Sequence, residues 1–420
     1  MTNANNRAPQ STATHHSGIR QYLLVTGNYW SFTLTDGALR MLVVLHFHQL
    51  GYTPLTIALL FLFYEIFGVI TNLIGGWLGA RIGLNHTMNM GLAMQVMALL
   101  MLTVPAELLS VPYVMAAQAL SGIAKDLNKM SAKSSIKMLA GSSQQSTLYR
   151  WVALLTGSKN ALKGAGFFLG GTLLAWLGFQ MALQAMAGAL TLVLISSLVS
   201  LKKDLGKSQH KAKFSDIFSK SREVNILSAA RLFLFGARDV WFVVALPVFL
   251  STELSWTHTE VGGFLALWVV GYGIIQTLAP QLTGKTTGQV PDGQTAFGWA
   301  AVLALIPVLI VWGMGLTSLD GSMQPSSTLS ALLIGGLLLF GGIFAINSSL
   351  HSFLIISYAK KDGVSLDVGF YYMANAMGRL IGTVLSGGLF QSYGLTACLL
   401  VSSLFLGITA LISWRLPRHP

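Results

Sequence analysis

The sequence predicts an all-α integral membrane protein with twelve transmembrane helices in two six-helix bundles. Only 10% of the 420 residues are charged, whereas 53% are hydrophobic. A soluble domain carries about 25% charged residues, so this chain lacks the polar surface that a water-soluble protein needs. The 44 glycines suit helices that pack closely and bend within a bilayer. The single cysteine, Cys398, excludes an intrachain disulfide and a cysteine-based metal site.

Twelve apolar segments are long enough to cross the hydrocarbon core of a bilayer, which needs roughly 20 residues. In the first half of the chain these segments are 22–50, 55–80, 88–108, 111–130, 148–178 and 179–201. In the second half they are 226–250, 260–283, 295–316, 329–358, 364–390 and 395–414. The boundary between the fifth and the sixth segment is the least sharply marked, and we place it near Gly178.

A polar segment separates the two sets of six. Residues 202–225 contain seven basic and three acidic residues. We therefore expect a cytoplasmic tail at 1–20, an N-terminal bundle at 21–201, a cytoplasmic linker at 202–225 and a C-terminal bundle at 226–416. The tail has no apolar core of the kind that a signal peptide has. The stretches DGALRMLVVLHF and GARDVWFVVALPVF, in the first and seventh segments, share residue types at similar offsets, which favours two parallel repeats.

The positions of the charges predict the orientation in the membrane. The net charge is +12, and the basic residues of the loops fall on one side if the segments alternate in direction. The loops of the opposite side contain only acids, namely Glu107, Glu253, Glu260 and Asp320. Because cytoplasmic loops carry an excess of Lys and Arg, we expect a multi-pass protein of the bacterial inner (cytoplasmic) membrane with both termini in the cytoplasm.

A small set of charged residues lies deep within the apolar segments. The cations are Arg40, Lys159, Lys163, Arg238 and Arg379, and the acids are Asp36, Glu65 and Asp239. A charge that faces lipid at the bilayer centre costs about 2.5–3.5 kcal/mol or more, so we expect these side chains to face a cavity or one another. Several of them lie near the middle of their segments, where secondary transporters hold their substrates.

The deep charges predict an anionic substrate. Five cations against three acids leave surplus positive charge, and buried charges need partners. Arginine offers a planar fork that suits phosphate or carboxylate, and lysine offers a mobile point charge. We expect substrate binding by Arg40, Lys159, Lys163, Arg238, Arg379 and Lys125, and proton coupling or gating by Asp36, Glu65 and Asp239. We expect no cofactor and no metal site.

Other interpretations of some charges stay open. Asp36 and Arg40 are four residues apart on one helix and can neutralise each other. Asp239 can pair with Arg40 or Arg238, and an ion pair between the halves would serve as a gate.

Lys125, Lys129 and Lys133 follow one another at four-residue steps. Extension of these side chains to the cytoplasmic surface explains most of this stripe, with Lys125 the deepest. The same interpretation applies to Arg231, whereas Arg379 is expected in the cavity.

The stretch GWLGARIGLN, at residues 76–85, resembles the loop motif of the major facilitator superfamily, Gly-x-Leu-Ala-Asp-Arg-x-Gly-Arg-Lys. It keeps Gly76, Leu78, Arg81 and Gly83, but Ala80 replaces the aspartate of the motif. The resemblance implies two bundles of six helices and a transport function. The loss of the aspartate argues against the cytoplasmic charge latch attributed to that motif.

Four longer stretches are similar to the ArsJ group of organoarsenical efflux permeases within this superfamily. They are NYWSFTLTDGALRMLVVLHFH, AAQALSGIAKDLNKMSAKSSIK, LTGSKNALKGAGFFLGG and SAARLFLFGARDVWFVVALPVF. The resemblance implies export of 1-arseno-3-phosphoglycerate, and so resistance to arsenate. It also implies a functional link to a glyceraldehyde-3-phosphate dehydrogenase, which forms this ester when arsenate replaces phosphate.

Three other function classes are weighed against this one. An organophosphate or phosphate exchanger, or an importer, would need the same basic cavity, because charge does not set the direction of transport. A membrane-embedded enzyme is disfavoured, since the deep residues are mostly cations and form no His/carboxylate or Ser-His constellation. A receptor is disfavoured because no soluble output domain is present. We expect a small anion and the lipid bilayer as partners, and no nucleic acid.

Overall fold

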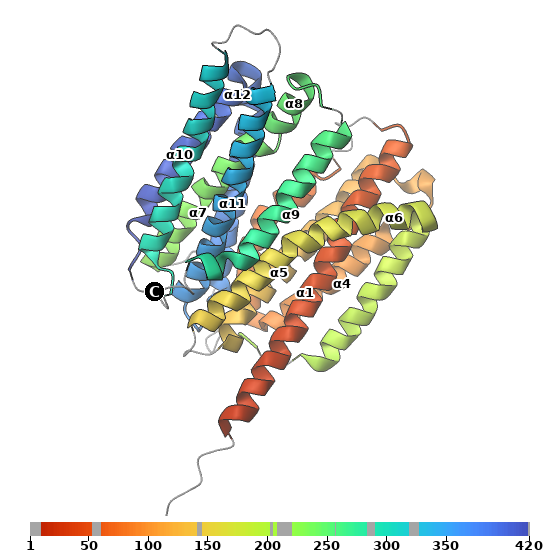
Figure 1. Ribbon diagram of the computed structural model, residues 1–420. Helices are drawn as coiled ribbons and strands as arrows, with labels where there is room; N and C mark the ends of the chain where they lie inside the picture. Colours follow the sequence, from red (N-terminus) through yellow and green to blue (C-terminus); the bar gives the residue numbers. More distant parts are fainter. Residues whose placement is uncertain are drawn as a thin grey trace, which may run out of the picture.

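The computed structural model describes residues 10–52, 60–140, 145–201, 205–207, 221–256, 258–283, 290–318 and 327–418. Within these ranges the regular elements are helices (Figure 1). They are α1 (Gln10–Gln49), α3 (Leu62–Ile82), α4 (Leu84–Met101), η1 (Ala106–Leu108), α5 (Val111–Ala140), α6 (Gln145–Ser200), α7 (Arg222–Phe242), α8 (Ala245–Thr252), α9 (His258–Thr283), α10 (Gly293–Ser318), α11 (Ser327–Tyr358) and α12 (Val364–Ser413). Most of the predicted linker, the start of the predicted tail and Asp320 lie outside the described residues.

Seven helices of the described ranges are long and apolar enough to cross a membrane, by length and composition. Two of these, α6 and α12, reverse direction at Gly178 (φ 73°) and Gly394 (φ 72°), so each supplies two spans. A positive φ of this size is accessible to glycine with little strain. With α7 and α8 taken as one span, and with α1, α4 and α5 added, the described helices supply the twelve expected spans.

The seventh predicted span, 226–250, is not one continuous helix. It breaks between α7 and α8 at Val243 and Val244. Pro247 lacks the backbone N–H that would bond to the carbonyl of Val243. The Ser386 hydroxyl of α12 accepts hydrogen bonds from the backbone N–H groups of Val244 (3.4 Å) and Ala245 (3.1 Å), so the break is held by a neighbouring helix.

The first residues of α1 and the C-terminus lie at the same end of the molecule (Figure 1). Arg81, Arg222, Lys360 and Arg415, which are exposed, also belong to this end. We call it the basic side; it is the side that the sequence predicts to be cytoplasmic.

The hydrophobic core shows where the two halves meet. One cluster of buried side chains, near the basic side, contains residues of both halves, including Tyr22, Tyr149 and Phe353. Toward the opposite side the core divides into two clusters, one made of residues 32–190 and the other of residues 234–406. The halves are therefore packed together on the basic side.

Glycines allow the close helix contacts on the basic side. A Cβ on Gly76 of α3 would lie 2.5 Å from the carbonyl oxygen of Ser365 in α12. A Cβ on Gly157 of α6 would lie 2.6 Å from the carbonyl oxygen of Gly273 in α9. Both distances are too short for any side chain larger than hydrogen. The α3–α12 and α6–α9 contacts thus bring the backbones of the two halves together, as small residues do in membrane helix packing.

Candidate functional site

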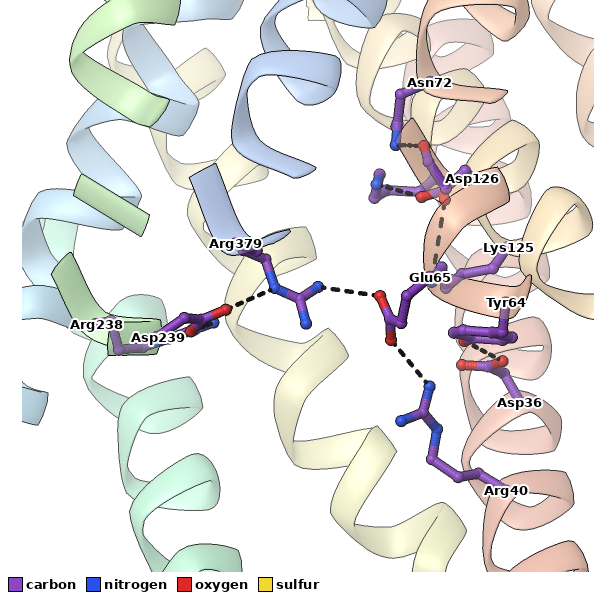
Figure 2. A network of polar contacts seen from close by, with 12 residues as sticks. Asp36, Arg40, Tyr64, Glu65, Asn72, Lys125, Asp126, Arg238, Asp239 and Arg379 are labelled. Carbon is purple, nitrogen blue, oxygen red and sulfur yellow. Dashed lines mark hydrogen bonds and ion pairs between the residues drawn. The ribbon is translucent and has the colours of Figure 1, made fainter. Parts of the chain in front are cut away.

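Five charged side chains form a chain that crosses from one half to the other (Figure 2). Arg40 of α1 lies 3.3 Å from Glu65 of α3, and Arg379 of α12 lies 3.9 Å from the other oxygen of Glu65. The Nε of Arg379 donates to Asp239 of α7 at 3.1 Å, and Arg238 contacts the second oxygen of Asp239 at 2.5 Å. All five residues are among those singled out in the sequence.

The middle of this chain is accessible, whereas its end in the second half is buried. The side chains of Glu65 and Arg379 are 43% and 40% exposed, while that of Asp239 is 0% exposed. Glu65 also lies within electrostatic range of Lys125 on α5 and Lys163 on α6. Charged side chains of both halves therefore lie around Glu65, which is itself partly accessible. This agrees with the general position in which membrane transporters bind substrate.

Asp36 and Arg40 do not form the ion pair that their spacing allows. The Asp36 carboxylate accepts a hydrogen bond of 2.7 Å from the Tyr64 hydroxyl, and Arg40 pairs with Glu65 instead. The Arg40 guanidinium also stacks over the rings of Tyr64 and Phe61, with 4.6 Å and 5.0 Å to the ring centroids. The direct ion pair is therefore absent, because α3 supplies nearer partners for both residues, although Asp36 stays within electrostatic range of Arg40.

Asp239 pairs within its own half. Its partners are Arg238, one residue before it, and Arg379 of α12. The pairing with Arg238 was one of the two possibilities that the sequence left open. Within the described ranges, Glu65 and not Asp239 makes an ion pair with the opposite half.

The three lysines of α5 have different surroundings. Lys125 lies over the Tyr64 ring at 3.7 Å and 4.0 Å from Asp126, and Lys129 contacts the same carboxylate. Lys133 is 4% exposed and donates a hydrogen bond of 2.5 Å to the Tyr372 hydroxyl of α12. Its predicted extension to the surface is wrong, since it bonds across the interface between the halves.

Among the central charged residues that the structure describes, Lys159 and Lys163 on α6 have no carboxylate partner. Both are partly buried, and neither lies within 4.0 Å of an acidic oxygen of the described residues. Lys163 is within electrostatic range of Arg40, Asp36 and Glu65. It therefore lies close to the chain of charged side chains around Glu65.

Arg231 on α7 is buried, contrary to the expectation that it extends to the surface. It is 3% exposed, and its Nε donates to Asn375 of α12 at 2.8 Å. Its Nη1 donates to the Ser348 carbonyl of α11 at 3.2 Å. These partners come from α12 and α11, so the sequence of α7 alone could not predict them.

Three polar residues with buried or charged surroundings were not predicted from the sequence. His351, in the run INSSLHS of α11, is 0% exposed. Tyr64 and Tyr372 each contact two or more of the charged side chains. The polar run within an otherwise apolar span was the available signal for His351, whereas nothing in the sequence distinguishes the two tyrosines from packing residues.

The motif-like stretch at residues 76–85 acts by close packing. Ala80, at the position of the family's aspartate, is 1% exposed, and Arg81 stacks on Trp77 at 5.1 Å. Gly76 packs on the backbone of Ser365, and Gly83 has a φ of 98° at the end of α3. Within this stretch, Gly76 therefore supplies a backbone contact between the halves, and the Ala80 side chain is buried.

The fold and the charged centre define a membrane protein of the secondary transporter class. The family model of the Major Facilitator Superfamily matches residues 23–352, and the chain belongs to this superfamily. It is therefore a transporter, not an enzyme, and a multi-pass integral membrane protein.

Solved structures of transporters resemble the chain over nearly its whole length. A variant of the Escherichia coli fucose:proton symporter FucP is 12% identical, with 95% of this chain and 98% of that chain covered and a TM-score of 0.73. The human organic anion transporter MFSD10 (TETRAN) is 16% identical over 94% and 99% of the chains, with a TM-score of 0.71. A bacterial homologue of the iron transporter ferroportin, in its outward-facing state, is 15% identical over 93% and 98%, with a TM-score of 0.70. No curated protein sequence matches the chain. At these identities the similarity establishes the fold.

Proposed function

We propose that the protein exports a small organic anion with more than one negative charge, and that this anion is 1-arseno-3-phosphoglycerate. Export of this ester would confer resistance to arsenate. The ester would be supplied by a glyceraldehyde-3-phosphate dehydrogenase acting on arsenate. The resemblance of four long stretches to the ArsJ group supports the choice of substrate, and the charges of the centre support its chemical class.

The observation that carries the proposal is the pair of lysines on α6 without carboxylate partners. Lys159 and Lys163 are four residues apart on a helix that contacts both α1 and α9. An uncompensated ammonium group in a partly buried position is unfavourable, so an anion that enters the space beside Glu65 would be stabilised there. A neutral sugar would leave both charges without a counter-ion.

The arginines offer a second set of donors. Arg40 and Arg379 share the two oxygens of Glu65, and so each guanidinium keeps further N–H groups for a ligand. We place one anionic end of the substrate at Lys159, Lys163 and Arg40, and the other at Arg238 and Arg379. Lys125, which lies over the Tyr64 ring, is the remaining cation of the proposed site.

Replacement of Lys163 by Gln tests this assignment. A hydrogen bond to a charged group is worth about 1.5–3 kcal/mol, so K163Q should weaken substrate binding by a factor of about 10 to 100. In an arsenate-sensitive bacterial strain, K163Q should lower the tolerated arsenate concentration, and so should R238Q. Lys361→Gln is the matched control, because Lys361 is exposed on the basic side.

Transport is measured in everted vesicles that receive glyceraldehyde-3-phosphate, its dehydrogenase, NAD and radiolabelled arsenate. Accumulation that depends on the dehydrogenase and is lost in K163Q supports the proposal. Uptake of labelled phosphate esters without arsenate would instead identify an organophosphate or phosphate exchanger. Unchanged arsenate tolerance and transport in both K163Q and R238Q, with wild-type amounts in the membrane, would remove these residues from the site.

A further inference from the structure

A second cluster of cations lies closer to the basic side than the central charges. Arg231 precedes Arg238 by two turns of α7, which places it about 10 Å nearer that side. Lys133 is likewise two turns beyond Lys125 on α5. The two are close enough to interact electrostatically. They also contact neighbouring rings, since Arg231 lies 5.2 Å from the Tyr371 ring and Lys133 lies 4.7 Å from that of Tyr372.

Neither cation has a carboxylate partner among the described residues. Lys133 bonds to the neutral Tyr372 hydroxyl, and Arg231 bonds to the neutral oxygens of Asn375 and Ser348. The hydrogen bonds of Arg231 to Asn375 and Ser348 use its Nε and Nη1. Two neighbouring buried cations without an acid repel each other and lack compensation for lost hydration. An anion between them would remove both costs.

His351 adds an unused polar group to this cluster. Its ring nitrogens, Nδ1 and Nε2, are both buried and have no hydrogen-bond partner within the described ranges. The ring lies within electrostatic range of Arg231, one turn along α11 from the Ser348 carbonyl that Arg231 contacts. A buried polar side chain without a hydrogen-bond partner is unusual in a protein interior unless something else binds it.

We propose that Lys133, Arg231 and His351 form a second oxyanion site, which binds a phosphate-type group on the basic side of the central charged residues. Arg231 would bind two oxygens in its planar fork, Lys133 would add a point charge, and the His351 N–H would donate a hydrogen bond. This site is separate from the central one and does not depend on the identity of the exported ester.

Entry to the site requires the halves to part on the basic side. Lys133 then loses its bond to Tyr372, and Lys137 of α5 loses its bond of 2.7 Å to the Ser357 carbonyl of α11. The freed Lys133 ammonium could then bind an anion from the cytoplasm. We therefore assign the second site to the first capture of the anion, before it moves to the central charges.

The experiment uses the purified full-length protein and three variants, with binding of inorganic phosphate and 3-phosphoglycerate measured by calorimetry. H351L is the principal variant, because it removes two unpartnered polar atoms and should leave folding intact. K133M retains the apolar stem of Lys133 but lacks its charge. K163Q, in the central site, is the matched control.

We expect phosphate to bind at two sites, the second site and the central site. H351L and K133M should each weaken binding at the second site at least tenfold, whereas K163Q should weaken binding at the central site. Wild-type binding in both H351L and K133M, together with a higher Tm of H351L, would show a ligand-free cluster and overturn the proposal. Displacement of bound phosphate by phosphatidylglycerol but not by 3-phosphoglycerate would assign the cluster to a lipid headgroup and also overturn it. Failure of K163Q to lower arsenate tolerance affects only the proposed function, because the phosphate sites are measured independently.

Discussion

Replacement of Glu65 by Gln should favour opening of the basic side, because Glu65 links the two halves through Arg379. At the observed 3.9 Å, two unit charges attract each other by about 4 kcal/mol at an effective dielectric constant of 20. Both side chains are about 40% exposed, so screening by water reduces this to about 1 kcal/mol, the upper range for exposed pairs. A loss of that size raises the population of a minor open state about fivefold.

A buried serine on the basic side reports this opening. Ser365 of α12 is 0% exposed and packs against Gly76 and Gly79. A cysteine introduced there, with the native Cys398 replaced by Ala, should react with a membrane-impermeant maleimide only when the halves part. In everted vesicles we expect E65Q to raise the labelling rate about fivefold.

The matched control for this measurement is R40Q. Arg40 pairs with Glu65 from the same half, so its loss removes an ion pair but no contact between the halves. The labelling rate of R40Q should stay near that of the unmodified background. Equal rates for E65Q and the background, or an equal increase in R40Q, would refute the assignment of Glu65 as the link.

Three further predictions concern stability and packing. Ser386→Ala should lower the Tm in detergent, because it leaves two backbone N–H groups at the α7–α8 break without their acceptor, at a cost of about 1–3 kcal/mol. Gly178→Ala should destabilise by about 1 kcal/mol or more through its positive φ, whereas Gly188→Ala, which meets no atom within 4 Å, should be close to neutral in the same melting assay. Gly157→Ala should raise the labelling rate of the Ser365 reporter, since its Cβ would lie 2.0 Å from the Thr277 hydroxyl oxygen; an unchanged rate would contradict the proposed α6–α9 closure.

The sequence was sufficient to predict the fold class, because the fold class depends on hydrophobicity summed over long segments. About 20 apolar residues identify a span in any membrane protein, and a glycine such as Gly178 marks a reversal. The break between α7 and α8 was not predicted, although Pro247 was visible. A proline near a helix end is compatible with either a bend or a break, and the choice depended on the Ser386 hydroxyl of another helix.

The position of the charged residues deep within the apolar segments could also be read from the sequence, but their interaction partners could not. Arg40 meets Glu65, and Arg379 meets Asp239, because each helix is rotated about its axis so that these side chains face each other. Spacing along one helix cannot report that rotation, and Asp36 and Arg40 accordingly contact Tyr64 and Glu65 of α3 instead of forming a direct ion pair. Arg231 shows the same limit, because its burial depends on acceptors from α11 and α12.

The proposed site connects substrate charge to the closure between the halves. Glu65 carries one negative charge and is shared by Arg40 and Arg379, while Lys163 lies within electrostatic range of it. An anion bound at Lys163 competes with Glu65 for the two guanidinium groups, and so weakens the ion pair that joins α3 to α12. A neutral ligand of the same size fills the space without this competition. Under this proposal, the energy of anion binding is used to release the contact between the halves, and E65Q should retain binding while losing the dependence of opening on the anion.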